Sequence, residues 1–360
     1  MSYITAIGTA VPANRFGQLE IAEFMARSLE LDEIEKRKLI ALYRSTKIQY
    51  RHSVIPDYGL PIESYQFYPN TQNLEPFPSV AHRMQVYKQT ALPLCVEATK
   101  GLSLEGITHL ITVSCTGMYA PGLDIELVQA LGLPTYTKRT AINFMGCYGA
   151  FNGLKVANDI CLANPDAKVL LVSVELCTLH FQKKKDLDFL LSNALFSDGA
   201  AAVIIEPRAP HEKVLKLESF YCDLFTEGQS DMAWHIADFG FEMTLTSYVP
   251  QLIKNGINQL VENLLEANGT RRDEVQYYAI HPGGRAILES VEIALGISSL
   301  DNQYAYEVLR DYGNMSSTTI LFVLKRVLEQ VNDENKGCKI LSCAFGPGLT
   351  VESLIAKMGV

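Results

Sequence analysis

The sequence predicts an α/β protein in which buried strands alternate with helices. Apolar or β-branched runs recur at residues 108–114, 140–162, 168–176 and 200–205. The run at residues 108–114 ends in a Cys-Thr-Gly turn, and Pro121-Gly122 then favours the start of a helix. Strands that are apolar on both faces must be covered on both sides. The pattern therefore indicates a sheet lying between layers of helices.

The chain is expected to fold in two halves. Its 360 residues suit about two substantial cores. A proline-punctuated link at residues 206–210 follows the first group of strands, and the sequence beyond it repeats the strand-and-helix plan more loosely. We place the boundary there, with an N-terminal half at residues 1–207 and a C-terminal half at residues 208–360.

The N-terminal half begins with a short β-prone run at residues 3–8, which Pro12 ends. Residues 19–43 are charged and amphipathic enough for one or two helices. Residues 54–80 are rich in Pro, Asn and Tyr and predict a surface loop, and residues 81–102 predict a long helix. The strands and helices of the repeated pattern follow.

The C-terminal half is expected to place several loops at one edge of its strands. Helices are predicted at residues 245–268, 287–295 and 318–330, and strands at residues 275–280 and 340–344. The first strand ends at His281 and a Pro-Gly-Gly turn, and the second enters Phe-Gly-Pro-Gly. Because ligands bind beyond the carboxyl ends of strands in such sheets, we expect these loops to converge.

Composition excludes several classes of function. The net charge is −9, and no basic cluster is interleaved with aromatic residues, which argues against a nucleic-acid partner. The eight cysteines show no CxxC pair and no His-rich companion, so we interpret them as reduced thiols rather than zinc ligands. The N-terminus lacks the pattern of a signal peptide, and no window is apolar enough for a membrane span. We therefore expect a cytoplasmic protein.

Cys147 is the candidate nucleophile. It lies between Gly146 and Gly149, at a turn from an expected strand into an expected helix. The glycines let backbone amides approach a bound group, and the helix N-terminus lowers a thiol pKa because its dipole favours the thiolate. The alternative is a structural cysteine, since free Cys is among the most buried residue types.

His281 and Asn314 complete a possible Cys-His-Asn site. His281 lies at a strand end and Asn314 at a helix start. Each has a simpler explanation: His281 as a hydrogen-bonded core residue, and Asn314 as an N-cap. Glycine-rich turns adjoin all three residues, and this coincidence favours a nucleophilic site.

Arg44, Lys47 and Arg51 form a cationic group after the first helical segment. They are interpreted either as a solvated helix end or as an anchor for a phosphorylated cofactor through charge-assisted hydrogen bonds.

Five segments of the chain resemble the signature segments of type III polyketide synthases, the chalcone synthase family. They are GCYGA at 146–150, ALFSDGAAA at 194–202, HPGGRAIL at 281–288, YGNMSS at 312–317 and FGPGLTVE at 345–352. Their order and spacing are similar to those of the family across essentially the whole chain. The resemblance implies a thiolase-type fold, in which two αβαβα halves form five layers, and a homodimer with an active site in each subunit.

The resemblance also implies a mechanism. Cys147 would take the starter acyl group from its coenzyme A thioester and then hold the growing chain. His281 would keep Cys147 ionised and, with Asn314, would donate hydrogen bonds to the thioester oxygen. The same donors would stabilise the enolate that forms when malonyl-CoA loses CO2. Coenzyme A thioesters are the implied substrates, and neither a metal nor a redox cofactor is expected.

The family's cavity residues can be carried over by position. Phe196 matches a gatekeeper aromatic, with core packing as the alternative, and a cavity-shaping loop matches Gly346, Pro347 and Gly348. The hydroxyl residues Thr116 and Ser316 are retained. Other positions depart from the plant enzymes: Cys115, Cys177 and His180 replace small hydroxyl residues, and Met243 replaces a second gatekeeper Phe.

Trp234, the single tryptophan, matches a cavity-widening glycine of the plant enzymes. It should fill space and block a bulky aromatic starter, although an ordinary core position is the alternative. The segment MAWHIADFGFEM at 232–243 resembles bacterial members that make alkylpyrones and alkylresorcinols. Ala120 replaces a methionine that reaches across the plant dimer, which leaves open whether it lies at a dimer contact.

The resemblance therefore implies an enzyme that extends an acyl-CoA starter with malonyl-CoA and cyclises the product to a pyrone or a resorcinol. Two alternatives stay open within related enzymes. One is a synthase of a small polyhydroxylated aromatic from malonyl-CoA alone, to which ELCTLHFQ at 175–182 is similar. The other is a single-condensation enzyme like ketoacyl carrier-protein synthase III. A catalytically inactive scaffold is the non-enzymatic alternative, which the complete Cys-His-Asn set argues against.

Overall fold

Within residues 1–246 and 248–359, which the computed structural model describes, nine strands form one sheet in the order β11-β12-β13-β8-β1-β7-β6-β4-β5. The N-terminal part contains β1 (Ser2–Ala10), β4 (His109–Ser114), β5 (Lys138–Asn143), β6 (Val169–Leu176) and β7 (Asp198–Glu206). The C-terminal part contains β8 (Leu215–Leu224), β11 (Val275–Ile280), β12 (Lys339–Gly346) and β13 (Thr350–Met358). β1 joins the two parts because it pairs antiparallel with both β7 and β8.

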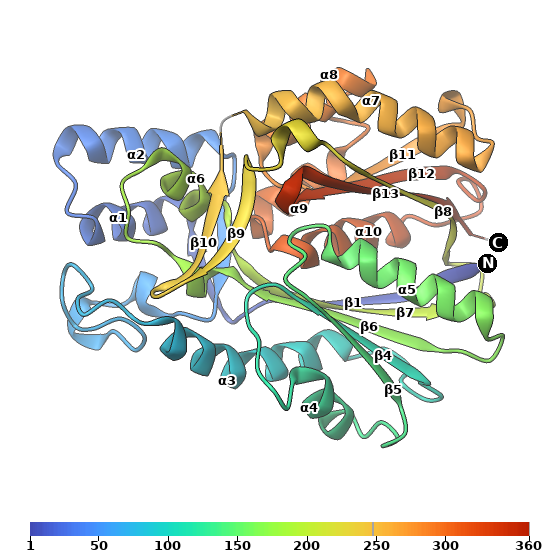
Figure 1. Cartoon of the computed structure of the whole chain (residues 1–360), viewed down its shortest axis with the longest axis horizontal. Coiled ribbons are helices and arrows are strands. Elements are labelled where there is room, and N and C mark those ends of the chain that lie inside the picture. Colours follow the sequence, from blue (N-terminus) through green and yellow to red (C-terminus); the bar gives the residue numbers. More distant parts are fainter. Residues whose placement is uncertain (247, 360) are drawn as a thin grey trace.

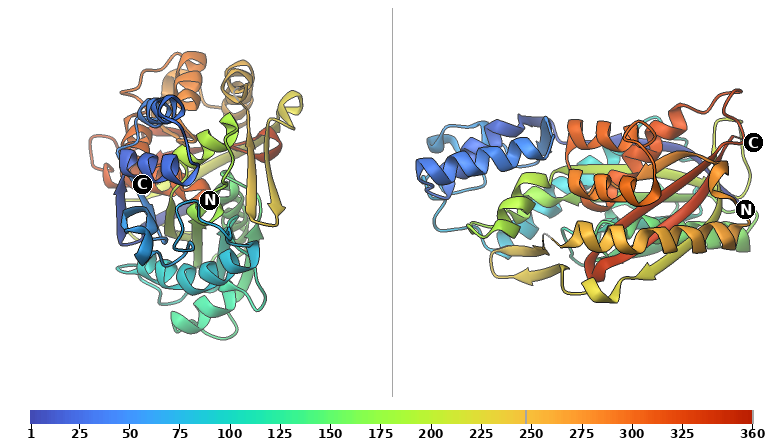
Figure 2. Two further views of the ribbon diagram at one scale, coloured as in Figure 1. Left: turned by 90° about the vertical axis from the view of Figure 1, so that its left-hand side faces the viewer. Right: turned by 90° about the horizontal axis from the view of Figure 1, so that it is seen from above.

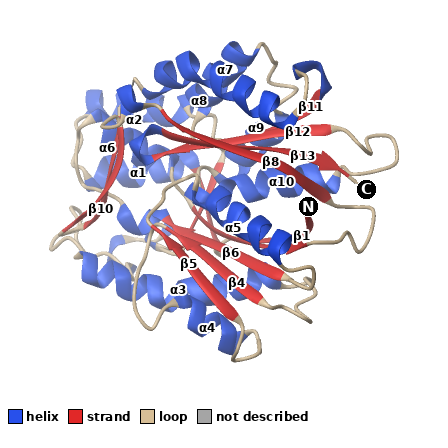
Figure 3. Ribbon diagram, turned by 45° about the vertical axis from the view of Figure 1, so that its right-hand side comes forward, coloured by secondary structure: helices blue, strands red, loops and turns tan. Residues whose placement is uncertain are grey.

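Helices separate and cover the two parts of this sheet (Figure 1). The middle layer holds α5 (Gly149–Ala163) and α10 (Thr319–Glu329). The outer layers hold α3 (Val80–Thr99) and α4 (Leu123–Ala130) on one side, and α7 (Val249–Asn268) and α8 (Arg285–Leu295) on the other. Figure 3 shows the same alternation of helix and strand layers. The five-layer αβαβα arrangement expected for the chain is confirmed.

Smaller elements gather at one end of the molecule, where the views of Figures 1 and 2 agree. They include α1 (Gln18–Ser28), α2 (Glu33–Ser45), α6 (Leu187–Leu195) and a hairpin of β9 (Met232–Ala237) and β10 (Gly240–Leu245). β2 (Asn14–Gly17) pairs with β3 (Tyr50–Ser53), and α9 (Gln303–Tyr312) precedes the loop that leads to α10. None of the described helices is both long and apolar enough to cross a membrane.

The central strands are apolar on both faces, as the sequence predicts. On β6, Leu170 and Val172 pack in the cluster that includes α3, whereas Val169 and Leu171 pack in the cluster around α5 and α10. Successive strand side chains point to opposite faces, so one strand serves two cores. Every residue of β4 is buried for the same reason.

Three expectations about the elements need correction. β5 is not a buried strand: among the described strands it pairs only with β4, at the sheet edge, and its residues other than Ile142 are exposed. The helix expected from residue 245 begins at Val249, because the preceding segment forms β10; residue 247 lies outside the described residues. The loop at residues 54–80 is not purely superficial, since Tyr58 and Tyr68 are buried in the first core.

Candidate active site

Cys147 lies in the turn between β5 and α5, against the loop that follows β12. Gly146 has a φ of +83°, and a Cβ on it would lie 2.1 Å from Cδ of Pro347. A Cβ on Gly346 would lie 2.5 Å from the ring of Tyr148 and 3.3 Å from the backbone nitrogen of Cys147. Real Cβ atoms essentially never come within 3.0 Å of another atom, so the approaches of 2.1 and 2.5 Å exclude a side chain at either glycine. The two glycine-rich loops can therefore pack together only because these positions carry no side chain.

Asn314 connects three of the signature segments. Its Nδ2 donates to the carbonyl oxygen of Gly283 at 3.1 Å, and its Oδ1 accepts from the backbone N–H of Ser316 at 2.9 Å. Its backbone N–H and carbonyl oxygen bond to Leu195 and Ser197, each at 2.9 Å. The loop before α10 is thus fixed against both the turn that follows β11 and the segment after α6.

The thiol of Cys147 lies close to this loop, because Ser316 and Asn314 both act to lower its pKa. His281 leaves the end of β11 with its N–H bonded to the carbonyl oxygen of Cys343 at 2.8 Å. Cys147 and His281 are 6% and 1% exposed, respectively. The three predicted catalytic residues therefore lie buried on neighbouring loops at one end of the strands.

The protonation state of Cys147 differs from the sequence prediction. Burial raises the pKa of its thiol to about 12, and the bonds from Ser316 and Asn314 lower it only in part. The expectation that the helix N-terminus lowers the pKa of this thiol is therefore wrong, because desolvation of the thiolate outweighs the effect of the helix dipole. Burial also lowers the pKa of His281 to about 3. Burial therefore favours the neutral thiol and the neutral imidazole in the folded chain.

The imidazole of His281 has unused hydrogen-bonding capacity. Neither Nδ1 nor Nε2 has a partner among the residues that the structure describes, although both atoms are buried. Buried polar side-chain atoms are normally paired. The ring thus keeps one donor and one acceptor for a group that is not part of the folded chain.

Glu175 is a buried acidic residue that sequence reasoning missed. Its carboxylate accepts hydrogen bonds from the backbone N–H of Cys115 and the hydroxyl of Thr116, each at 2.9 Å, and from the hydroxyl of Ser317. Burial raises the pKa of Glu175 to about 7, although these bonds oppose the shift. Its negative charge also contributes to the raised pKa of Cys147. The sequence feature that could have indicated a buried carboxylate is this single Glu near the end of an otherwise uncharged strand.

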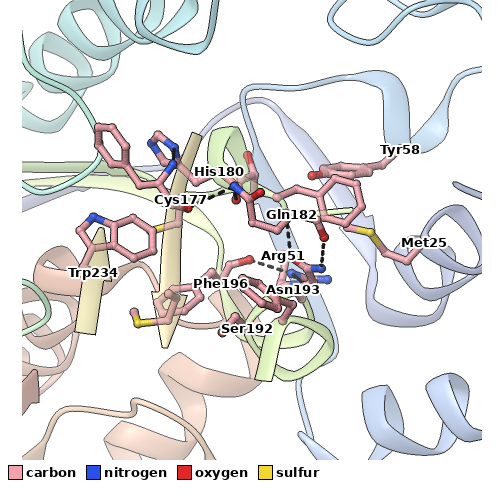
Figure 4. A pocket seen from close by; sticks show the side chains of 15 residues that line it. Met25, Arg51, Tyr58, Cys177, His180, Gln182, Ser192, Asn193, Phe196 and Trp234 are labelled. Carbon is pink, nitrogen blue, oxygen red and sulfur yellow. Dashed lines mark hydrogen bonds between the residues drawn. The ribbon is translucent and has the colours of Figure 1, made fainter. Parts of the chain in front are cut away.

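A cavity beside these loops brings together five of the predicted lining residues, as Figure 4 shows. They are Cys177, His180, Phe196, Trp234 and Met243. Phe196 forms a backbone bridge with Asn314, and the pKa of Cys177 is raised chiefly by burial and also by Cys147. The cavity is therefore close to Cys147. Cys115 lies beside the nucleophile turn, with its sulfur accepting from the N–H of Gly146 at 2.9 Å.

Trp234 forms a fixed wall of this cavity. Its Nε1 donates to the carbonyl oxygen of Cys115 at 3.0 Å, and its ring meets those of His180 and Phe241 edge-on. The ring centroids are 5.7 and 5.9 Å apart in these two pairs. The tryptophan therefore fills the space between the β9–β10 hairpin and the end of β4.

His180 holds the same wall in place. Its ring stacks on Phe241 at 4.1 Å, with 9° between the planes. Nε2 lies 2.7 Å from the carbonyl oxygen of Thr116, and Nδ1 accepts from the backbone N–H of Phe241 at 3.0 Å. Because a carbonyl oxygen only accepts, Nε2 carries the hydrogen, and burial lowers the pKa of His180 to about 3. His180 is thus a neutral structural brace.

The predicted phosphate-binding cations do not come together. Arg51 is buried and donates to Gln18 Oε1 at 2.8 Å and to the carbonyl oxygens of Asn193 and Phe196 at 2.8 and 2.7 Å. These bonds correct its assignment as a surface anchor. Arg44 and Lys47 line a separate surface hollow beside the start of α1.

A different groove leads to the His281 loop. Its walls are mostly apolar and include Leu195, Leu245, Val249, Gly283, Gly284 and Ile287, and Arg285 is its only lysine or arginine among the described residues. Arg285 pairs with Glu289 through a 2.6 Å contact from Nε to Oε1. Within the described chain, no cluster of three or more His, Cys, Asp or Glu side chains could hold a metal ion.

The five layers and the adjoining cysteine, histidine and asparagine loops define the class: a thiolase-fold acyltransferase. Comparison with known families makes the assignment specific. The model of the N-terminal domain of chalcone and stilbene synthases matches residues 1–208, and that of the C-terminal domain matches residues 216–358. The chain belongs to this family and is a type III polyketide synthase.

Relatives from distant organisms share the whole length of the chain. Type III polyketide synthase C of Arabidopsis thaliana is 31% identical, and the aligned region covers 98% of this chain and 94% of the Arabidopsis protein. Alpha-pyrone synthesis polyketide synthase-like Pks18 of Mycobacterium tuberculosis is 28% identical, and the aligned region covers 99% of this chain and 91% of Pks18. The crystal structure of PKS-I from the brown alga Ectocarpus siliculosus is similar with a TM-score of 0.90, at 30% identity over 99% and 98% of the two chains.

Proposed function

We propose that Cys147 takes an acyl group from an acyl-CoA starter. The thiol sulfur forms a bond to the thioester carbon, its proton passes to His281, and coenzyme A leaves as a thiol after receiving that proton. Neutral His281 suits this role because it can accept a proton as the sulfur attacks. The observation that carries the proposal is the buried and unpartnered imidazole of His281 on a loop that Asn314 holds through Gly283.

The same two side chains would serve the extension step. Malonyl-CoA loses CO2 when its carboxylate carbon–carbon bond breaks, and the electron pair moves onto the thioester oxygen as an enolate. Asn314 donates one amide hydrogen to Gly283, which leaves its second for this oxygen, and His281 offers a ring N–H. Fixed donors aimed at a developing oxyanion are the main means of stabilising it. The enolate carbon then attacks the acyl group on Cys147 and releases the thiolate.

We further propose an aliphatic starter and a pyrone or resorcinol product. Support comes from Trp234, which occupies the wall where a wider cavity would be needed for an aromatic starter, and from the similarity to Pks18. The test is mass spectrometry of products from malonyl-CoA with short, long and aromatic acyl-CoA starters, and with no starter. Efficient use of the aromatic starter would contradict the proposal, and product from malonyl-CoA alone would favour the small polyhydroxylated aromatic.

Changing Trp234 to glycine should widen the cavity. We expect Trp234→Gly to raise kcat/KM for an aromatic acyl-CoA at least roughly tenfold relative to the wild-type enzyme, because differences of pocket volume alone give 10–200-fold discrimination. Steady-state kinetics with an aromatic and a hexanoyl starter would measure this ratio. Phe239→Ala, at the exposed hairpin tip, is the matched control. An unchanged ratio in Trp234→Gly would show that the tryptophan does not limit the starter.

We propose that the groove beside Gly283 and Gly284 takes the pantetheine arm of coenzyme A and that Arg285 faces its phosphates. Arg285→Gln should then raise KM for malonyl-CoA roughly fivefold with little change in kcat, the magnitude of an exposed ionic contact. The KM for malonyl N-acetylcysteamine, which has no phosphate, should not change. Glu289→Gln, which frees Arg285 from its partner, is the control and should not weaken binding. An equal rise for both thioesters would contradict the phosphate contact.

We also propose a cytoplasmic homodimer that needs no cofactor beyond its coenzyme A substrates. The exposed edge of β5 offers unpaired backbone groups to a second chain. Ala120 is exposed beside that edge and lines one hollow with Ala141 and Asn143, so we place it at the dimer contact. The eight free cysteines favour a reducing compartment. Sedimentation equilibrium at the mass of one 40.0 kDa chain would contradict the dimer.

A further inference from the structure

The cavity of Figure 4 extends past Phe196 to a second, partly polar region. Trp234 and His180 lie on one side of Phe196 in this view, and Tyr58 and Met25 lie on the other. Arg51 and Ser192 belong to the lining of the same cavity. We name the part lined by Met25, Arg51, Tyr58 and Ser192 the distal arm.

Arg51 brings a buried charge to the distal arm, and no ion pair to it is found among the described residues. Its side chain is 3% exposed, and its acceptors are one amide oxygen and two backbone carbonyl oxygens, all neutral. Asp198 is close enough for its pKa to be influenced by Arg51, but its carboxylate accepts from Thr178 and Val54. Among the described residues, Nη2 of Arg51 has no partner. A buried cation without a counter-charge is costly unless a ligand completes its contacts.

Ser192 supplies a second unused donor. It lies on α6, is buried, and its Oγ has no partner in the described part of the chain. Met25, Tyr58 and Phe189 add apolar or aromatic surface to the lining of the same cavity. One guanidinium nitrogen and one hydroxyl in such surroundings would select an oxygen that accepts hydrogen bonds, and they would reject a plain methylene chain.

We propose that the distal arm binds a keto oxygen of the acyl chain held on Cys147, with Arg51 and Ser192 as its donors. The inference rests on the proposed function, since only an enzyme that extends a chain with malonyl units produces keto oxygens in this cavity. It assigns Arg51 to chain recognition rather than to coenzyme A phosphates. Binding of one keto oxygen would fix how the chain enters the cavity and how far it can grow.

Starters that differ only by one oxygen test this assignment. Acetoacetyl-CoA is compared with butyryl-CoA, 4-oxopentanoyl-CoA with pentanoyl-CoA, and 5-oxohexanoyl-CoA with hexanoyl-CoA, so that the keto group is moved stepwise from the thioester. We expect kcat/KM for at least one keto starter to exceed that of its saturated match roughly tenfold, because an analogue without the oxygen leaves buried donors unpaired. Equal values in all three pairs would overturn the inference and would indicate that water occupies the arm.

Two variants make the test specific to the distal arm. Ser192→Ala removes an unpartnered hydroxyl and should retain the fold, so it can carry the test even if Arg51→Gln destabilises the chain. We expect the keto preference to fall to within about twofold in either folded variant, because kcat/KM for the keto starters falls more than kcat/KM for the saturated starters. A full preference in Ser192→Ala would overturn the assignment of its hydroxyl. Absence of product from every starter would instead refute the proposed function.

Discussion

Cys147→Ala should abolish both acyl loading and chain extension. Cys147 lies where the Gly146 and Gly346 loops pack together, and alanine at this position has no group that can form a thioester. We expect product formation to fall by at least roughly 10³-fold, as with other nucleophile deletions. The measurements are intact-protein mass after incubation with acyl-CoA and product yield with malonyl-CoA.

Cys222→Ala is the matched control, because Cys222 is an exposed thiol on β8. It should load and extend acyl groups like the wild-type enzyme. An acyl adduct that persists in Cys147→Ala and disappears in Cys222→Ala would place the nucleophile elsewhere. Thermal unfolding of both variants would confirm that any loss of activity is not a loss of fold.

Asn314→Ala should weaken decarboxylation of malonyl-CoA more than it weakens loading. In the proposed mechanism the amide donates to the enolate oxygen during decarboxylation, whereas loading also depends on attack by the Cys147 sulfur and proton transfer through His281, which this amide does not supply. Loss of a single oxyanion donor costs about 10²–10³-fold in rate. We expect a loss of that size in CO2 release and roughly a tenfold loss in loading, measured by isotope release and by single-turnover acylation.

Asn314→Asp separates the donor from the local structure. Aspartate keeps the oxygen that accepts from the N–H of Ser316 but loses the Nδ2 donor. It should therefore reproduce the loss of CO2 release, and thermal unfolding of both variants would show that each remains folded. Equal losses of loading and decarboxylation in both variants would contradict the distinct role of this amide.

The sequence predicts the positions of the loops that carry Cys147, His281 and Asn314 better than it predicts their environment. His281 and Asn314 follow or precede strongly patterned strands and helices, and parallel pairing of β11 with β12 places their carboxyl ends at one edge. β8 was not predicted because its charged and apolar residues are mixed, which reflects its half-exposed position. The β9–β10 hairpin was missed for a similar reason, since tertiary contacts with Trp234 and Phe241 determine its place.

Electrostatic predictions failed where they depended on burial. The position of Cys147 at a helix start suggests a lowered thiol pKa, but burial of the thiol raises that pKa. How deeply the thiol is buried depends on how the surrounding loops pack, which the local sequence does not show. Arg51 seemed equivalent to Arg44 and Lys47 in the sequence, yet β3 turns it into the core. Glu175 was overlooked because nothing in the strand sequence shows that three donors from separate segments converge on it.

The central claim is that Cys147 carries a chain extended by decarboxylation of malonyl-CoA. Incubation with hexanoyl-CoA and carboxyl-labelled malonyl-CoA, followed by peptide mapping and isotope counting, tests both parts together. We predict a hexanoyl or extended acyl group on the Cys147 peptide and one labelled CO2 for each unit added. An acyl group on another cysteine, or a folded protein that releases no labelled CO2, would contradict the claim.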